Sequence, residues 1–227
     1  MCEAALTSNR VVRSCRNTAK DSAIQPRSLS PRETQILDCA LKLLIERGDA
    51  GLTLRKLADC AGMRLSNVQY YFGSRDDVLS AMVARYFQTC TAQLTRLTRE
   101  SPARTPRDRV HFLIVAVLAH GVDISDMCRA FREIWAISSR NAVIDHCLMD
   151  YYRGFSGVLA DFAVPEGVDT ARRDRLTALL VPFFEGYSIT ARSLPLAPQE
   201  TAAMLTDLAL SILETGNLQT PTPRDAS

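Results

Sequence analysis

Apolar residues recur at helical spacing along most of the chain, which predicts an all-α protein. The first apolar stripe follows a helix start at Ser30-Pro31-Arg32-Glu33 and ends at Gly48; its members are Ile36, Leu37, Ala40, Leu41, Leu44 and Ile45. A second apolar face, from Val78 to Phe87, predicts a helix that starts at Ser74 and ends near Arg99. The remainder shows no alternating strand pattern, and it predicts helices over 106–120, 125–138, 142–163, 169–193 and 198–215.

Two short helices at a tight turn are predicted between Gly48 and Ser74. Thr53 is a good N-cap for the leading helix, whose apolar face comprises Leu54, Leu57, Ala58 and Ala61. Gly62 supplies a left-handed helix stop. Ser66 restarts the chain as an N-cap, and Gln69 completes a capping box three residues later. This spacing is that of a helix-turn-helix, whose second helix lies in the DNA major groove.

The charged and polar residues of this segment agree with binding to DNA. Arg55, Lys56, Arg64 and Arg75 outnumber the single acidic residue, Asp59, between Thr53 and Arg75. The outer face of the short second helix carries Asn67, Gln69 and Tyr70, and amide side chains can pair with the adenine edge. We predict that Asn67, Gln69 and Leu65 face bases. The full set of predicted DNA contacts is Thr53, Arg55, Arg64, Leu65, Ser66, Asn67, Gln69, Tyr70 and Arg75.

The segment TLRKLADCAGMRLSNVQYYFGSRDDVL resembles the DNA-binding segment of the tetracycline-repressor (TetR) family. The family pattern is T-x-x-x-[IL]-A, A-G-V, Y-x-Y-F and S-[KR]-[DE]-[DE]-L-L, and the matching positions are Thr53, Leu57, Ala58, Ala61, Gly62, Tyr71, Phe72, Ser74, Arg75 and Leu79. The resemblance extends from about Ser30 to Met82. Gln69 stands where the family commonly has Tyr, which alters the expected base preference, and Gly73 stands where it often has Lys. The resemblance implies a dimeric regulator, more often a repressor than an activator.

Composition and charge place the predicted units along the chain. The 227 residues are 47% hydrophobic and 23% charged, which is typical of globular proteins. The net charge is +3 over residues 1–29, +2 over 30–75 and −4 over 106–216. The positive N-terminal part is therefore the part expected to bind a polyanion such as a double-stranded DNA operator. We expect four segments: a disordered basic tail (1–29), a three-helix helix-turn-helix domain (30–82), a helical effector-binding and dimerisation domain (83–216) and a disordered tail (217–227).

No residue pattern indicates catalysis, a metal site or a cofactor. The seven cysteines are odd in number and contain no C-x-x-C, and the three histidines show no metal-ligand spacing. Neither a G-x-S-x-G elbow nor a P-loop occurs. The longest apolar run, Phe112 to Ala119, is too short to cross a bilayer. We therefore expect a cytoplasmic protein that is not an enzyme and does not enter a membrane.

The last two predicted helices carry long apolar stripes that suit a homodimer. Two adjacent helices can pair with the same two of a second copy to form a four-helix bundle, and the TetR family dimerises in that way. The predicted interface residues are Leu176, Leu180, Phe183, Phe184, Tyr187, Leu205, Leu208 and Ile212. The alternative is that these helices complete the core of a monomer.

Aromatic and sulfur-containing residues on the middle helices suit a pocket for a small, often apolar effector, as the resemblance implies. The predicted wall residues are Phe112, Phe131, Trp135, Met149 and Tyr152. Such residues at helical spacing also fill ordinary cores. A second functional hypothesis therefore remains, namely a helical small-molecule-binding or enzymatic protein whose helix-turn-helix is an interaction module.

Overall fold

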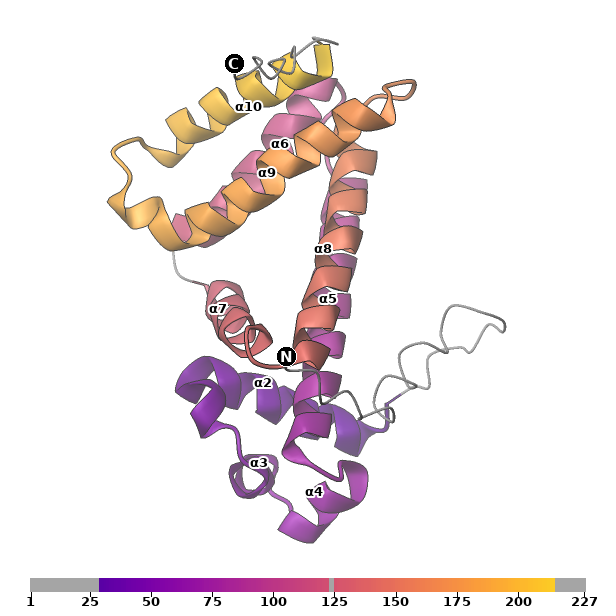
Figure 1. Cartoon of the computed structure of the whole chain (residues 1–227), viewed down its shortest axis with the longest axis vertical. Helices are drawn as coiled ribbons and strands as arrows, with labels where there is room; N and C mark the ends of the chain where they lie inside the picture. The colour runs from indigo at the N-terminus through magenta and orange to yellow at the C-terminus, as the bar shows by residue number, and fades with distance from the viewer. Residues whose placement is uncertain (1–28, 123–124, 215–227) are drawn as a thin grey trace, which may run out of the picture.

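The computed structural model describes residues 29–122 and 125–214 (Figure 1). Within these residues the chain forms helices and turns with no strand, which confirms the predicted all-α class. The helices are α2 (Pro31–Gly51), α3 (Leu54–Ala61), α4 (Leu65–Tyr71), α5 (Arg75–Arg99), α6 (Pro106–Val122), α7 (Asp126–Ser138), α8 (Ala142–Ala163), α9 (Thr170–Thr190), the short 3-10 helix η1 (Ala191–Ser193) and α10 (Pro198–Glu214). The predicted tails, 1–29 and 217–227, lie outside the described residues except for Leu29.

Helix α2 begins as its sequence predicts but does not end at the predicted glycine. Ser30 Oγ accepts a hydrogen bond from the Glu33 N–H (3.2 Å), and the Ser30 N–H donates to Glu33 Oε2 (2.8 Å), which completes a capping box. Gly48 has φ +66° and interrupts the helical geometry, and helical structure then resumes as far as Gly51. The predicted stop at Gly48 is therefore an internal kink.

Helices α3 and α4 meet at a left-handed glycine. Thr53 Oγ1 caps α3 by accepting a hydrogen bond from the Lys56 N–H (3.2 Å), and Gly62 ends it with φ +62° and ψ +36°. The predicted capping box of Ser66 and Gln69 is wrong, because α4 begins at Leu65 with Arg64 as its N-cap and no side-chain capping bond. The turn between the two helices is thus two residues shorter than its polar residues suggest.

One buried core joins the N-terminal helices to α7 and the start of α8. It contains Leu57 of α3, Val68 of α4 and Leu79 of α5, together with Ile134 of α7 and Ile144 of α8. Helix α2 packs against α3 and also contacts α5 and α7. We call the unit formed by α2, α3, α4 and the first turns of α5 the head.

A second buried core lies at the opposite end of the molecule. It is built from α6, the second half of α8, α9 and α10, with Ile114, Leu159, Leu180 and Ala209 among its buried residues. Helices α5 and α8 pack side by side and run between the two ends (Figure 1). Among the described residues, no helix is long and apolar enough to cross a membrane.

Candidate functional site

Helix α4 presents its polar residues on the outside of the head. Val68 is fully buried, whereas Asn67, Gln69 and Tyr70 are exposed, and 84% of Tyr70 is open to solvent. This split follows from helical geometry, because positions 67, 69 and 70 lie on the side of α4 away from Val68. The other predicted DNA contacts Thr53, Arg55, Arg64 and Ser66 are also exposed, while Leu65 is half-buried.

Arg75, at the start of α5, is held by contacts within the protein. Its Nε donates to the Leu52 carbonyl (2.8 Å), and its Nη2 donates to the Asp49 carbonyl (3.0 Å) and pairs with the Asp49 carboxylate. Nη1 also pairs with Asp76 (3.3 Å). These contacts tie α5 to the chain that leads into α3. Arg75 therefore positions the head, and its predicted phosphate contact stays a prediction.

Gln35 provides a second brace that the sequence pattern did not reveal. Its Nε2 donates to the Ala61 carbonyl (2.9 Å) and so fixes the end of α3 against α2. Arg85 Nη1 on α5 donates to Asp38 Oδ1 on α2 (2.6 Å). Buried apolar contacts also join α2, α3 and α5, so these three helices hold α4 in a fixed position.

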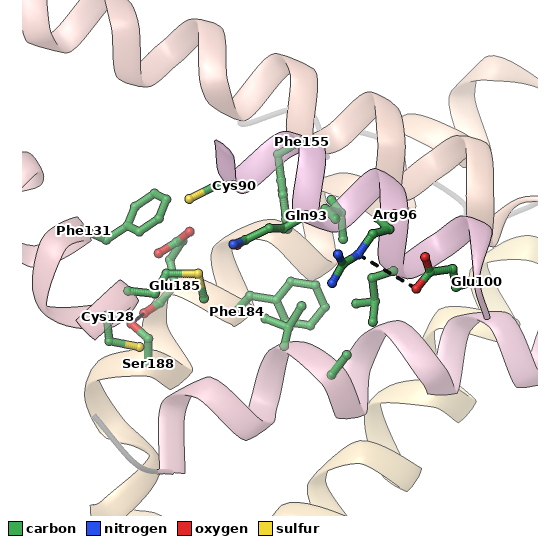
Figure 2. Close-up of a pocket in the computed structure, with 15 residues that line it drawn as sticks. Cys90, Gln93, Arg96, Glu100, Cys128, Phe131, Phe155, Phe184, Glu185 and Ser188 are labelled. Atoms are coloured by element: carbon green, nitrogen blue, oxygen red, sulfur yellow. Dashed lines mark hydrogen bonds and ion pairs between the residues drawn. The ribbon is translucent and has the colours of Figure 1, made fainter. Parts of the chain in front are cut away.

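A cavity of about 440 Å³ lies among α5, α6, α7, α8 and α9. Figure 2 shows Glu185, Phe131 and Ser188 at one end of it, Gln93 and Phe184 between, and the ion pair of Arg96 with Glu100 (3.9 Å) at the other end. The remaining lining residues are mostly apolar and include Leu94, Ala116, Val117, Met127 and Phe155. The volume and the mostly apolar walls are typical of small-molecule sites.

A short hydrogen-bonded relay ends on the carboxyl group of Glu185. Trp135 Nε1 donates to the Tyr152 hydroxyl (2.8 Å), and the Tyr152 side chain hydrogen-bonds Glu185. Burial raises the pKa of Glu185, and the hydrogen bond with Tyr152 partly opposes that shift. Burial also raises the pKa of Tyr152, and it raises the pKa of the nearby Cys90 thiol to about 11.

Comparison with known proteins decides the family. Residues 36–82 match the sequence profile of a family described as "Bacterial regulatory proteins, tetR family". An HTH-type transcriptional regulator in the dhlA 5′ region of Xanthobacter autotrophicus is 41% identical over 186 residues, which cover 81% of this chain and 91% of the relative. The chain belongs to the TetR family. It is a transcriptional regulator of the helix-turn-helix type.

Solved structures share the fold of this TetR-family chain. SCO7518 from Streptomyces coelicolor A3(2) has a TM-score of 0.65 at 20% identity, and the match covers 82% of this chain and all of that one (100%). The multidrug binding protein EbrR complexed with malachite green has a TM-score of 0.60 at 19% identity over 82% of this chain and 100% of that one. The predicted arrangement, an N-terminal helix-turn-helix followed by a helical C-terminal domain, is confirmed.

Of the five residues predicted to line an effector pocket, one lines the cavity of this TetR-family regulator and four lie outside it. Phe131 lines the cavity, whereas Trp135 and Tyr152 lie behind it and reach it through Glu185. Phe112 packs against Phe162 (ring centroids 6.1 Å apart), and Met149 is exposed on the surface; neither lines this cavity.

The sequence pattern did not identify the polar lining residues Gln93, Glu185 and Ser188. Glu185 carried a usable signal, since it is a single charged residue inside the apolar run from Leu176 to Tyr187. A charge in such a run must either reach solvent or lie in a polar niche.

The predicted interface residues lie mostly inside the protomer. Leu176, Leu180, Phe184, Tyr187 and Leu205 belong to the second buried core, and Ile212 is also buried; Phe184 also lines the cavity. Phe183 is half-buried, and Leu208 is exposed. The most apolar face of a helix usually packs against the core of its own protomer. The sequence pattern therefore identified the buried faces of α9 and α10. The outward apolar residues are instead Pro182 and Ile189 on α9 and Met204 and Leu208 on α10.

Proposed function

We propose that this TetR-family regulator binds a palindromic DNA operator as a homodimer and is released from it when a small molecule occupies the cavity. The observation that supports release is the shared use of α5. Val78, Leu79 and Met82 in its first turns are buried in the head core, while Cys90 and Gln93 farther along line the cavity. A ligand that displaces the second half of α5 therefore displaces the head as well.

Helix α7 supplies a second connection between cavity and head. Phe131 lines the cavity and belongs to the same buried core as the head. Two residues after it, Glu133 Oε2 accepts a hydrogen bond from the Asp49 N–H (3.2 Å) at the kink in α2. Gly48 permits this approach, because a Cβ there would lie 3.1 Å from Glu133 Oε2.

In the proposed complex, α4 enters the major groove. Asn67 and Gln69 pair with base edges, and Leu65 contacts a thymine methyl group. Thr53, Arg55, Arg64, Ser66 and Tyr70 are exposed where they can hold the flanking phosphates. The two heads of a dimer would read half-sites about 34–36 Å apart, or a multiple of that distance.

Release requires a ligand that prefers the arrangement unable to bind DNA. A ligand with equal affinity for both arrangements shifts nothing, however tightly it binds. EbrR, which shares this fold, is a multidrug binding protein complexed with malachite green, and this supports a small-molecule role for the cavity. We propose repression as the mode of regulation and the cytoplasm as the compartment, and we assign no catalytic step to the chain.

Selection of bound sequences from random DNA tests the first half of the proposal. A palindromic consensus with half-sites one helical turn apart is the expected result, and its affinity should fall steeply as the salt concentration rises. Absence of any salt-sensitive, sequence-specific binding would instead favour a helix-turn-helix that serves as an interaction module. Release is tested by adding candidate effectors to the preformed complex.

A further inference from the structure

The cavity contains an acidic residue, Glu185, that no described Lys or Arg pairs with. Among the described residues, no Lys or Arg forms an ion pair with Glu185. Arg96 also lines the cavity, but it pairs with Glu100 at the other end, and Arg132 of α7 donates to the Ser188 carbonyl (2.7 Å). An ionised carboxylate in such surroundings is costly unless something positive compensates it.

The hydrogen-bonded relay is directed so that it supports an ionised Glu185. An indole N–H can only donate, so the oxygen of Tyr152 accepts from Trp135 and its proton remains free to be donated onward. The acceptor for that proton is Glu185. Hydrogen bonds donated to a carboxylate stabilise its ionised form, so this arrangement favours a charged Glu185.

Aromatic rings form much of the wall near this carboxylate. Phe131, Phe155 and Phe184 line the cavity with Glu185 (Figure 2). Phe131 is backed by Phe87 and Tyr151, with ring centroids 5.6 and 5.3 Å away, so its ring is held in a packed cluster. Aromatic faces attract cations, and the attraction grows when water is excluded.

We propose that the cavity binds an apolar, aromatic or alkyl-substituted monocation, such as an amine or quaternary ammonium, with its positive group at Glu185. This inference rests on the proposed effector cavity and specifies the charge of its ligand. The positive group of the ligand neutralises the charge of Glu185. The apolar part of the ligand contacts Leu94 and Val117 and extends toward the Arg96–Glu100 end of the cavity. A neutral ligand of the same shape leaves the carboxylate uncompensated, and an anion is repelled.

Two probes that differ in one atom test the charge preference. Phenyltrimethylammonium and tert-butylbenzene have the same shape, but only the first is charged. Binding to the full chain is measured by calorimetry and by the fluorescence of Trp135, the single tryptophan of the sequence, which connects to the cavity through Tyr152. The cation should bind about tenfold or more tightly than its neutral counterpart.

Three variants separate the role of Glu185 from a general effect of charge. Glu185→Gln keeps the side-chain shape and should abolish the preference, and Glu185→Asp should retain it in part. Glu166→Gln removes an equal charge from an exposed residue after α8 that does not line the cavity, and it should change the cation affinity by less than about twofold. Thermal melting and DNA binding establish that each variant is folded.

The outcomes of these measurements distinguish this inference from the proposed function. Equal affinity for the two probes, or a cation affinity unaffected by Glu185→Gln, overturns the charge assignment and leaves an effector cavity in place. If neither probe binds, the charge assignment fails together with the effector cavity. The proposed operator binding is judged separately by selection from random DNA, because Glu185 lies on α9 and outside the head.

Discussion

Single residues on α4 divide the proposed recognition into base reading and phosphate binding. Gln69 and Arg64 are both exposed, but Gln69 lies on the outer face of α4 whereas Arg64 precedes its first turn. A bidentate amide contact is worth about 1–3 kcal/mol at one base pair, whereas a phosphate contact is independent of sequence.

The two substitutions at these positions should therefore differ in kind. Gln69→Ala should relax the preference at one base pair of each half-site, and selection from random DNA would detect the change. Arg64→Ala should weaken binding to all sequences and reduce the slope of log affinity against log salt concentration by about one for each phosphate that it leaves unneutralised. An unchanged preference in Gln69→Ala would remove Gln69 from the reading set.

The raised pKa of Glu185 predicts that the free energy of unfolding depends on pH. Burial raises its pKa in the folded protein above the value of about 4.3 expected in the unfolded chain. The folded state therefore binds this proton more tightly, so the carboxyl costs nothing below its unfolded pKa, lowers stability increasingly as the pH rises from there to its folded pKa, and has its full cost above the folded pKa. Tyr152 and Cys90 stay neutral between pH 5 and 8, because their pKa values are also raised.

The test of this cost is the melting temperature of Glu185→Gln relative to the unsubstituted protein. We expect the variant to be the more stable of the two at pH 8 and the difference to narrow toward pH 5. A constant difference at all pH values would mean that Glu185 does not titrate in this range.

At the scale of elements, the turn between α3 and α4 depends on one backbone conformation. Gly62 has φ +62°, and apart from its two chain neighbours no described residue has an atom within 4 Å of the position that a Cβ would take. Gly62→Ala should therefore lower the free energy of unfolding by about 1–2 kcal/mol through backbone strain alone. Urea unfolding measures the loss.

Gly73→Ala is the matched control for that turn. Its Cβ would make an ordinary contact with Asp77 Oδ2 at 3.4 Å, and no left-handed φ is required there. We expect a change of less than about 0.5 kcal/mol. Similar effects at the two positions would show that the left-handed conformation is not what makes Gly62 important.

Helices were predictable from the sequence because their ends carry local signals. Thr53, Gly62 and Ser74 act through their own neighbours, so the sequence pattern places α3 and the start of α5 correctly. The start of α4 was misplaced because Ser66 and Gln69 match a capping box, although the turn after Gly62 lets the helix begin at Leu65. A local pattern does not show which of two possible starts, two residues apart, the folded protein uses.

The cavity was only partly predictable, for a reason that applies to the whole molecule. Its lining comes from five helices spread over residues 90–188, and no local pattern records which residues meet. Aromatic content identified Phe131, but the same criterion also selected Phe112, which packs against Phe162. Glu185 and Arg75 owe their roles to contacts with residues distant in the sequence, namely Tyr152 for the first and Asp49 for the second.

The outward face of α9 and α10 is the surface through which we expect the proposed homodimer to form. Met204 and Leu208 are 52% and 48% exposed on adjacent turns of α10, beside α9. Leu208→Glu places a charge on this face in both copies and should weaken the dimer by about 100-fold or more, with operator binding lost in parallel. Leu196→Glu alters a residue of similar exposure (44%) that precedes α10 and should leave both unchanged. Sedimentation equilibrium decides the matter: an intact Leu208→Glu dimer would place the interface elsewhere.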